Sequence, residues 1–272
     1  MTKNTNKFNI IENQKYFRYE INGEPGLKML FTTRRGGASN GRYESLNMGY
    51  STLDDKKLIY ENRAIVLNEF NLGIDRMVSS DQIHGIKVVE VTDFKKDYGE
   101  CDGLFTAEKN TVLCMYFADC TPLFFWDAKK RAGGLVHSGW RGTCNGIGRE
   151  SIKFMAEKYG SRPEDITVVI GPSIGHCCFE VGAEVAREFE EKLDKKITSG
   201  NITLKSKTSK ESAPKYLINL KKINYNLLTD CGISPDNILT HEICTCCRRE
   251  LFFSYRRDNR DTGRMAGLFF IQ

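Results

Sequence analysis

Residues 111–138, TVLCMYFADCTPLFFWDAKKRAGGLVHS, contain three short apolar runs that predict three neighbouring strands. The runs cover residues 111–117, 123–126 and 133–137. Short apolar runs rich in β-branched and aromatic residues, and bounded by turns, are typical of buried strands. Cys120 lies in the turn between the first two runs, and His137 ends the third. We therefore expect a sheet whose strand ends carry chemically active side chains.

Outward from this region, apolar spacing predicts further elements on both sides. Helices are expected over residues 58–72, 148–159, 182–193 and 220–229. Further strands are expected over residues 28–33, 77–81, 86–91, 166–170 and 238–241, around FFSYRRD (252–258) and around AGLFFI (266–271). Strands outnumber helices, so we predict a mixed α/β or α+β sandwich with functional residues on loops at one edge.

The domain organisation predicted is a single domain over residues 1–272, a length that suffices for one substantial core. The stretch 195–215, KKITSGNITLKSKTSKESAPK, is polar and poor in large apolar residues. We predict a polar surface excursion there rather than a domain boundary.

The composition argues against several classes of protein. The chain is 40% hydrophobic and 28% charged, and its net charge of +5 is spread along mixed-sign segments, which does not favour a nucleic-acid partner. No apolar run approaches the roughly 18 residues of a membrane span, and the first residues lack a secretory signal. We expect a cytoplasmic protein in which some of the ten cysteines are free thiols and some are functional. Protein partners are not specified by the sequence.

A candidate metal site follows from the positions of His84, Cys120 and His137 at strand ends. Two imidazoles and a thiolate from separate strand ends make the three-ligand set of a catalytic zinc with one open position. Asp119 beside the cysteine could fix a histidine tautomer or orient a water molecule. The same atoms could instead form a nucleophilic Cys120–His137 thiolate–imidazolium pair, as in cysteine hydrolases. Sequence order does not separate these two chemistries.

A second cysteine group also suggests a metal. Cys177 and Cys178 are adjacent, and Cys244 and Cys247 have the separation of a zinc knuckle. Adjacent cysteines rarely bind one ion, and knuckle glycines are missing. We therefore expect these cysteines to serve in packing or in a substrate loop rather than to form a four-thiolate metal site.

Anion-binding groups are expected near two glycine loops, GWRGT (139–143) and GPSIG (171–175). Each is predicted to precede a helix, whose first N–H groups can bind an anion. Arginines that could bind phosphate are Arg141, Arg256, Arg257 and Arg264, and aromatic residues that could stack on a base are Trp140, Phe179 and Tyr255.

Several blocks resemble a known family. They are FTTRRGGASNGRYESLNMG (31–49), DQIHG (81–85), FADCTPLFFWD (117–127), LVHSGWRGT (135–143), GPSIGHCCFEV (171–181) and FFSYRRDNRDTGRMAGLFF (252–270). Together they resemble the signature blocks of YfiH-type laccase-domain proteins. The resemblance implies a four-layer α/β/β/α sandwich, similar to the catalytic domain of cytotoxic necrotizing factor toxins. It also implies that His84, Cys120 and His137 bind zinc or copper.

The resemblance implies two very different activities. One is a zinc-dependent purine nucleoside phosphorylase that cleaves adenosine, inosine and methylthioadenosine with phosphate and also deaminates adenosine. The other is a copper-dependent polyphenol oxidase; a multicopper centre needs more histidines than the four in this chain. For the phosphorylase we expect Cys120 and His137 as catalytic residues, and Arg141, Asn47 and Arg257 as substrate contacts.

Overall fold

A computed structural model describes residues 7–205 and 213–272, and the strands within these ranges form three sheets. The first contains, in spatial order, β1 (Phe8–Glu12), β2 (Tyr16–Ile21), β3 (Leu27–Thr32), β15 (Met265–Ile271), β7 (Val112–Phe117) and β4 (Met77–Val78). The second contains β14 (Ile238–Thr240), β10 (Ile166–Ile170), β8 (Thr121–Asp127), β9 (Ala132–Ser138), β6 (Gly103–Thr106) and β5 (Val88–Glu90). The small third sheet contains β11 (Glu180–Gly182), β13 (Lys215–Ile218) and β12 (Ile202–Leu204).

Both large sheets are mixed. In the first, β4 pairs parallel to β7, whereas β15 is antiparallel to both of its neighbours, β3 and β7. In the second, β5 and β6 are parallel, and β8 is antiparallel to β9. This arrangement confirms the mixed α/β class.

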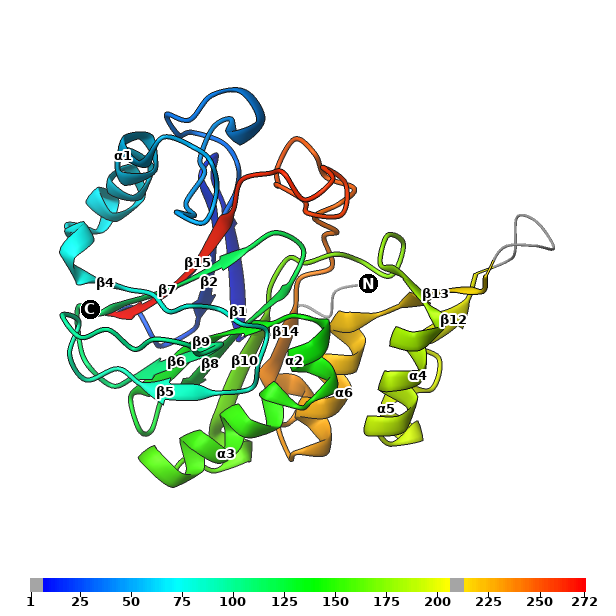
Figure 1. The fold of residues 1–272 in the computed structure, drawn as a ribbon. Coiled ribbons are helices and arrows are strands. Elements are labelled where there is room, and N and C mark those ends of the chain that lie inside the picture. The colour runs from blue at the N-terminus through cyan, green and yellow to red at the C-terminus, as the bar shows by residue number, and fades with distance from the viewer. Residues whose placement is uncertain (1–6, 206–212) are drawn as a thin grey trace.

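Helices cover the outer faces of the two large sheets (Figure 1). The helices are α1 (Lys56–Leu67), α2 (Trp140–Cys144), α3 (Ile147–Tyr159), α4 (Ala183–Lys192), α5 (Lys195–Thr198) and α6 (Leu220–Asp230). Figure 1 shows α1 beside the first sheet, α2, α3 and α6 beside the second, and α4 and α5 with the small sheet at one side.

Strand β15 shows how the sequence pattern places the core. Leu268 and Phe270 pack into the cluster that includes Val66 and Leu67 of α1. Phe269 lies in the cluster shared by the two large sheets. Successive side chains of a strand point to opposite faces, so the continuous apolar run MAGLFFI fills two cores at once. Full burial of each such large side chain contributes about 1.5–3 kcal/mol.

The other predicted strands and helices are present with shifted ends, but residues 252–258, predicted as a strand, form an irregular segment and turns instead. The elements that were not predicted are β1, β2, β6, β11, β12, β13, α2 and α5. The glycines at 171–175 lead into a turn and β11 rather than directly into a helix. The description as a four-layer sandwich, the likeness to the toxin domain and the single domain over 1–272 stay predictions.

The polar stretch 195–215 is more structured than predicted. It contains α5, β12 and the first residue of β13, while its residues 206–212 lie outside the described residues. Ile197 and Asn201 are buried there. The stretch therefore packs against the rest of the chain at several points.

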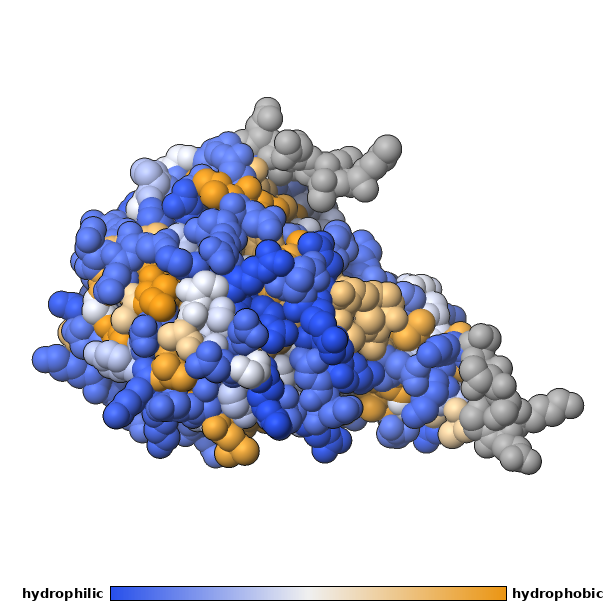
Figure 2. Space-filling view, turned by 90° about the horizontal axis from the view of Figure 1, so that it is seen from above, coloured by the Kyte–Doolittle hydropathy of each residue, from blue (hydrophilic) through white to orange (hydrophobic). Residues whose placement is uncertain are grey.

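The outer surface gives no sign of an extended apolar face in the direction shown in Figure 2. Seen from above, the molecule is mostly hydrophilic, and its hydrophobic residues form separate spots. Within residues 7–205 and 213–272, no helix has both the length and the apolar character needed to cross a bilayer.

Candidate metal centre and substrate pocket

The structure brings His84, Cys120 and His137 together, as predicted. His84 lies between β4 and β5, Cys120 lies in the turn between β7 and β8, and His137 is in β9. Their ligand atoms all lie within 4.8 Å of one another, and Cys120 Sγ is 4.0 Å from His84 Nε2. This spacing would allow the three side chains to share one metal ion.

Strand register explains part of this convergence. The antiparallel pairing of β8 with β9 places Pro122 opposite His137 and Thr121 opposite Ser138, so Cys120 lies just beyond the end of the pair. His84 and Asp119 have positive φ angles, 62° and 91°. Such backbone conformations cost non-glycine residues about 1–3 kcal/mol and often mark functional sites.

A buried carboxylate that the sequence analysis missed orients the histidines. Asp102 Oδ1 is 2.8 Å from Nδ1 of His137. The Asp102 carboxylate also accepts hydrogen bonds from the backbone N–H groups of residues 83, 84 and 85, at 3.2, 3.1 and 2.7 Å. With Nδ1 of His137 engaged, Nε2 is left to bind a metal, an arrangement common in metal sites.

The pKa of Asp102 agrees with this role. Burial raises the pKa of this carboxyl, but the hydrogen bond and the charge of His137, with the N–H groups of Gly85 and His84, bring it below its ordinary value. Asp102 is therefore ionised and can hold an N–H proton on His137.

The prediction that Asp119 orients a histidine was wrong. Its Oδ1 accepts a hydrogen bond from the Thr245 hydroxyl at 2.6 Å. Its Oδ2 accepts hydrogen bonds from the Ser254 hydroxyl at 2.9 Å and the Arg256 N–H at 2.8 Å. Asp119 thus ties the turn that carries Cys120 to the segment 245–256.

Cys120 and His137 influence each other's protonation. Burial raises the pKa of the Cys120 thiol, but the charge of His137 and hydrogen bonds to His137 and His84 lower it to about 6. Burial lowers the pKa of His137, but the charge of Cys120 and the hydrogen bond to Asp102 raise it to about 9. The thiolate is therefore the favoured form of Cys120, which suits both a metal ligand and a nucleophile.

The space beside the three ligand atoms fits a metal ion. A Cβ atom added at Gly139 would lie 2.9 Å from Cδ2 of His84 and 3.2 Å from Sγ of Cys120. Glycine at this position keeps the gap between the two ligands open. Two imidazoles and one thiolate are a donor set found for zinc.

The three ligands open into a cavity of about 1100 Å³, slightly above the usual range for small-molecule pockets. Its lining combines cationic and aromatic side chains. The arginines are Arg63, Arg141, Arg256 and Arg264, and the aromatic residues are Tyr50, Tyr116, Trp140, Phe179 and Tyr255. Tyr50 and Tyr255 are exposed, so part of each side chain is accessible to a ligand.

The predicted substrate contacts divide into two groups. Arg141 lines the cavity, and its guanidinium lies 4.3 Å from the Trp140 ring centroid. Asn47 is buried, and its side-chain oxygen accepts the Arg264 N–H at 2.9 Å. The Arg257 guanidinium donates to the carbonyls of residues 245, 246 and 252. The structure therefore does not bring Asn47 and Arg257 to the cavity, whereas Arg256 does line it.

Arg63 was missed, although the sequence held a signal for it. It lies on α1 between Ile59 and Val66, on the helix face that is buried. Its guanidinium donates to the Met48 carbonyl at 2.9 Å and lies 4.0 Å from the ring centroid of Tyr50. A charged residue on an apolar helix face indicates a buried functional or structural role.

Comparisons with known proteins identify relatives of this chain. The family model for multi-copper polyphenol oxidoreductase laccase matches residues 28–272. The chain is 37% identical over 244 residues to purine nucleoside phosphorylase YlmD of Bacillus subtilis, covering 86% of this chain and 85% of that protein. It is 32% identical over 270 residues to a purine nucleoside phosphorylase of Staphylococcus epidermidis, covering 95% of this chain and 97% of that protein.

Solved structures show the same overall fold. The crystal structure of YlmD from Geobacillus stearothermophilus has a TM-score of 0.87 at 32% identity, covering 98% of this chain and 99% of that one. The crystal structure of a hypothetical protein YfiH from Bacillus licheniformis also has a TM-score of 0.87, at 30% identity, and covers 98% and 100% of the two chains.

Proposed function

The chain belongs to the family described as multi-copper polyphenol oxidoreductase laccase, which here includes relatives named purine nucleoside phosphorylase, and we propose that it is a metal-dependent purine nucleoside phosphorylase. One observation carries this proposal. The three ligand residues, several arginines and several aromatic rings all line one cavity. A nucleoside and a phosphate together need such a combination of groups.

The proposed reaction assigns the pocket groups to parts of the substrates. An oxygen of inorganic phosphate bonds to C1′ of the sugar, the C1′–N9 bond breaks, and the purine leaves with the proton that the phosphate gives up. Arg141 and Arg256 bind the phosphate by charge-assisted hydrogen bonds. Aromatic side chains such as Tyr255 stack on the base. Holding both substrates in one cavity lowers the entropic part of the barrier.

Inosine, adenosine and methylthioadenosine are the proposed substrates. The products are the free base and ribose 1-phosphate or its methylthio derivative. Adenosine deamination is the proposed side activity, in which water replaces the C6 amino group and ammonia leaves. The free thiols of all ten cysteines support the further proposal that the protein works in the reducing cytoplasm.

His84, Cys120 and His137 would hold the metal, and zinc is the ion we propose. Zinc bound there would supply Lewis-acid polarisation with one open coordination position. Copper also accepts such ligands, but a multicopper centre needs more histidines. The two other histidines of the chain bond elsewhere: His176 to Thr203 at 2.9 Å and His241 to Tyr19 at 2.8 Å. We therefore favour phosphorolysis over phenol oxidation as the activity of this protein.

The deciding experiment incubates the zinc-loaded protein with inosine and phosphate. We expect hypoxanthine and ribose 1-phosphate in equal amounts, and no base release when phosphate is omitted. The matched variant Cys120→Ala, which removes one ligand, should lose this activity. Absence of both products with zinc-loaded protein would overturn the proposal.

A Cys–His hydrolase is a second candidate, because one specific observation favours it. Cys120, His137 and Asp102 combine a low thiol pKa with an imidazole held by a carboxylate. A hydrolase of this kind works without metal and loses activity when the thiol is alkylated. Hydrolysis of an activated ester by chelator-treated protein, abolished by iodoacetamide, would support this candidate over the phosphorylase.

A further inference from the structure

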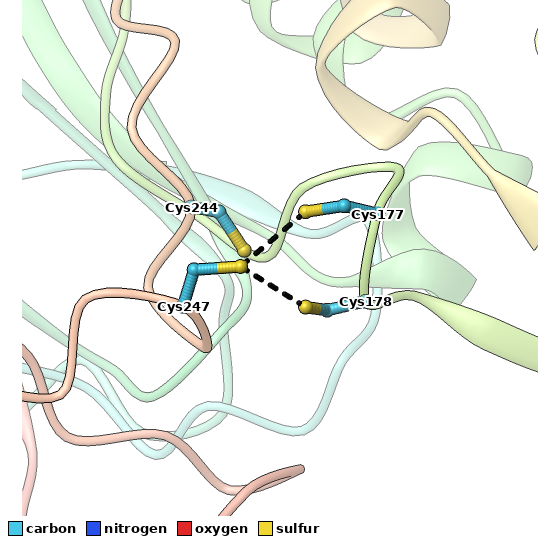
Figure 3. A group of neighbouring side chains, drawn as sticks. All are labelled: Cys177, Cys178, Cys244 and Cys247. Atoms are coloured by element: carbon cyan, nitrogen blue, oxygen red, sulfur yellow. Dashed lines mark hydrogen bonds between the residues drawn. The ribbon is translucent and has the colours of Figure 1, made fainter.

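Outside the cavity just described, four sulfur atoms from two distant segments converge on one point (Figure 3). Cys177 and Cys178 come from the turn before β11, and Cys244 and Cys247 come from the segment after β14. Cys247 Sγ lies 3.3 Å from Sγ of Cys178 and 3.6 Å from Sγ of Cys177. All four sulfur atoms lie within 4.8 Å of one another.

These distances distinguish a metal site from a disulfide. A disulfide requires a sulfur–sulfur distance of about 2.05 Å, and all four cysteines are free. In a tetrahedral site with zinc–sulfur bonds of about 2.3 Å, neighbouring sulfur atoms are about 3.8 Å apart. We propose that Cys177, Cys178, Cys244 and Cys247 bind a structural zinc ion as four thiolates, separate from the ion in the cavity.

Gly175 removes one objection that the sequence raised against this site. Its N–H donates to Sγ of Cys244 at 3.1 Å. A Cβ atom at this position would lie 3.0 Å from Cβ of Cys244 and 3.2 Å from Sγ of Cys177. Gly175 thus supplies both the N–H group and the space that knuckle glycines usually provide.

The second objection concerned the adjacent cysteines. The sulfur atoms of Cys177 and Cys178 nevertheless both reach Cys247. The turn at 175–179 makes this possible, because the N–H groups of Cys178 and Phe179 both bond to the Gly175 carbonyl at 3.0 Å. The earlier preference for packing or substrate-loop roles is therefore reversed.

Three cationic side chains bond to backbone carbonyls beside the cluster, where they would oppose the net negative charge of a zinc ion with four thiolates. The buried Lys221 ammonium donates to the Ile243 carbonyl at 2.7 Å, next to Cys244. Arg256 donates to the Cys178 carbonyl at 3.4 Å, and Arg257 donates to the Thr245 and Cys246 carbonyls at 3.1 Å each. Cationic side chains therefore donate hydrogen bonds to the backbone of both segments that carry the cysteines.

The zinc would clamp one wall of the cavity. Phe179 and Glu180, directly after Cys178, line the cavity, as do Tyr255 and Arg256 from the other segment. Both segments also bond to Asp119, through the Ile174 N–H at 2.9 Å and the Thr245 hydroxyl at 2.6 Å. The site itself rests only on the cysteine cluster and does not depend on the proposed catalytic activity.

Metal analysis of protein purified under reducing conditions tests the proposal. The double variant His84→Ala/Cys120→Ala loses two of the three proposed cavity ligands, and we expect it to retain one zinc per chain. Adding Cys247→Ser should remove that zinc, whereas adding Cys246→Ser, one residue away, should not. X-ray absorption at the zinc edge of the folded double variant should show four sulfur neighbours at about 2.3 Å.

Several results would overturn the proposal. In the metal analysis, these results are a double variant that holds no zinc, or one that holds iron in place of zinc. In the absorption spectrum, nitrogen or oxygen neighbours of the zinc would contradict four thiolates. A Cys178–Cys247 disulfide that persists under reducing conditions would also contradict the site. As a further readout, removing the zinc should increase amide exchange in residues 173–180 and 244–257. Unchanged exchange there would contradict the clamping role.

Discussion

Asp102 and His137 form a buried carboxylate–imidazole pair, in which Oδ1 of Asp102 lies 2.8 Å from Nδ1 of His137. The same carboxylate accepts the backbone N–H of His84 at 3.1 Å. One side chain therefore holds two of the three proposed metal ligands, one through its ring and the other through its backbone.

Asp102→Asn should weaken metal binding without unfolding the protein. The asparagine side chain lacks the charged carboxylate that accepts the hydrogen bond from the His137 ring. Loss of such a partner typically lowers metal affinity about 10–100-fold. Zinc titration with a competing chelator measures this change. Asp127→Asn is the control, because Asp127 is equally buried and accepts backbone N–H groups of residues 129 and 130. An equal loss of affinity in both variants would contradict a specific role for Asp102.

Gly139→Ala should also reduce metal affinity. The added methyl group would lie 2.9 Å from the His84 ring and 3.2 Å from the Cys120 sulfur, so at least one ligand must move. Gly148→Ala is the control, because its Cβ would meet nothing closer than 3.5 Å and it lies in a helix, where alanine is favoured by about 1 kcal/mol. Unchanged zinc affinity in Gly139→Ala would show that the gap is not needed.

Arg141 and Arg257 should respond differently to replacement by alanine. Arg141→Ala should raise KM for phosphate roughly 10–100-fold, the range expected for one lost charge-assisted hydrogen bond, with little change in Tm. Arg257→Ala should lower the free energy of unfolding by about 2–4 kcal/mol, because its guanidinium bonds to three carbonyls and to Asp258. Steady-state kinetics and thermal unfolding of both variants check this. A Tm loss in Arg141→Ala as large as in Arg257→Ala would contradict it.

His241 should make stability depend on pH. Burial, and then the charge of Lys221, lower the pKa of His241 from 6.5 to about 4. Between these values the unfolded chain binds the extra proton, so the free energy of unfolding should fall as the pH falls, by up to about 3 kcal/mol.

Denaturant unfolding from pH 7.5 to pH 4.5 measures this effect. The variant His241→Gln keeps an acceptor for the Tyr19 hydroxyl, which now bonds to Nδ1 at 2.8 Å. Its stability should fall less steeply over the same range. Parallel curves for the two proteins would show that His241 does not contribute.

The sequence singled out His84, Cys120 and His137 because each lies at or near the end of a predicted apolar strand, but it did not predict the carboxylate beside them. Asp119 was favoured because it adjoins Cys120. Its φ of 91° belongs to a turn whose carboxylate bonds to Thr245 and Ser254 instead. Asp102 precedes a strand of only four residues, β6, and only the sheet order brings it beside His137.

Non-local bonds also explain the incorrect strand prediction. Residues 252–258 contain aromatic side chains of the kind common in strands, yet Ser254 and Arg256 both bond to Asp119. These bonds hold the segment in turns that direct Arg256 to the cavity and Arg257 to backbone carbonyls. Local propensity does not contain such information. Only the folded structure shows that Arg256, and not the adjacent Arg257, lines the cavity.

The position of β15 sets an order for assembly during synthesis. Residues 265–271 fill the gap between β3 and β7, and Gly267 lies opposite both Phe31 and Met115. On the ribosome, residues 27–32 and 112–117 emerge well before the strand that joins them. We expect the nascent chain to carry two unpaired strand edges until that point, a state prone to aggregation and suited to chaperone binding.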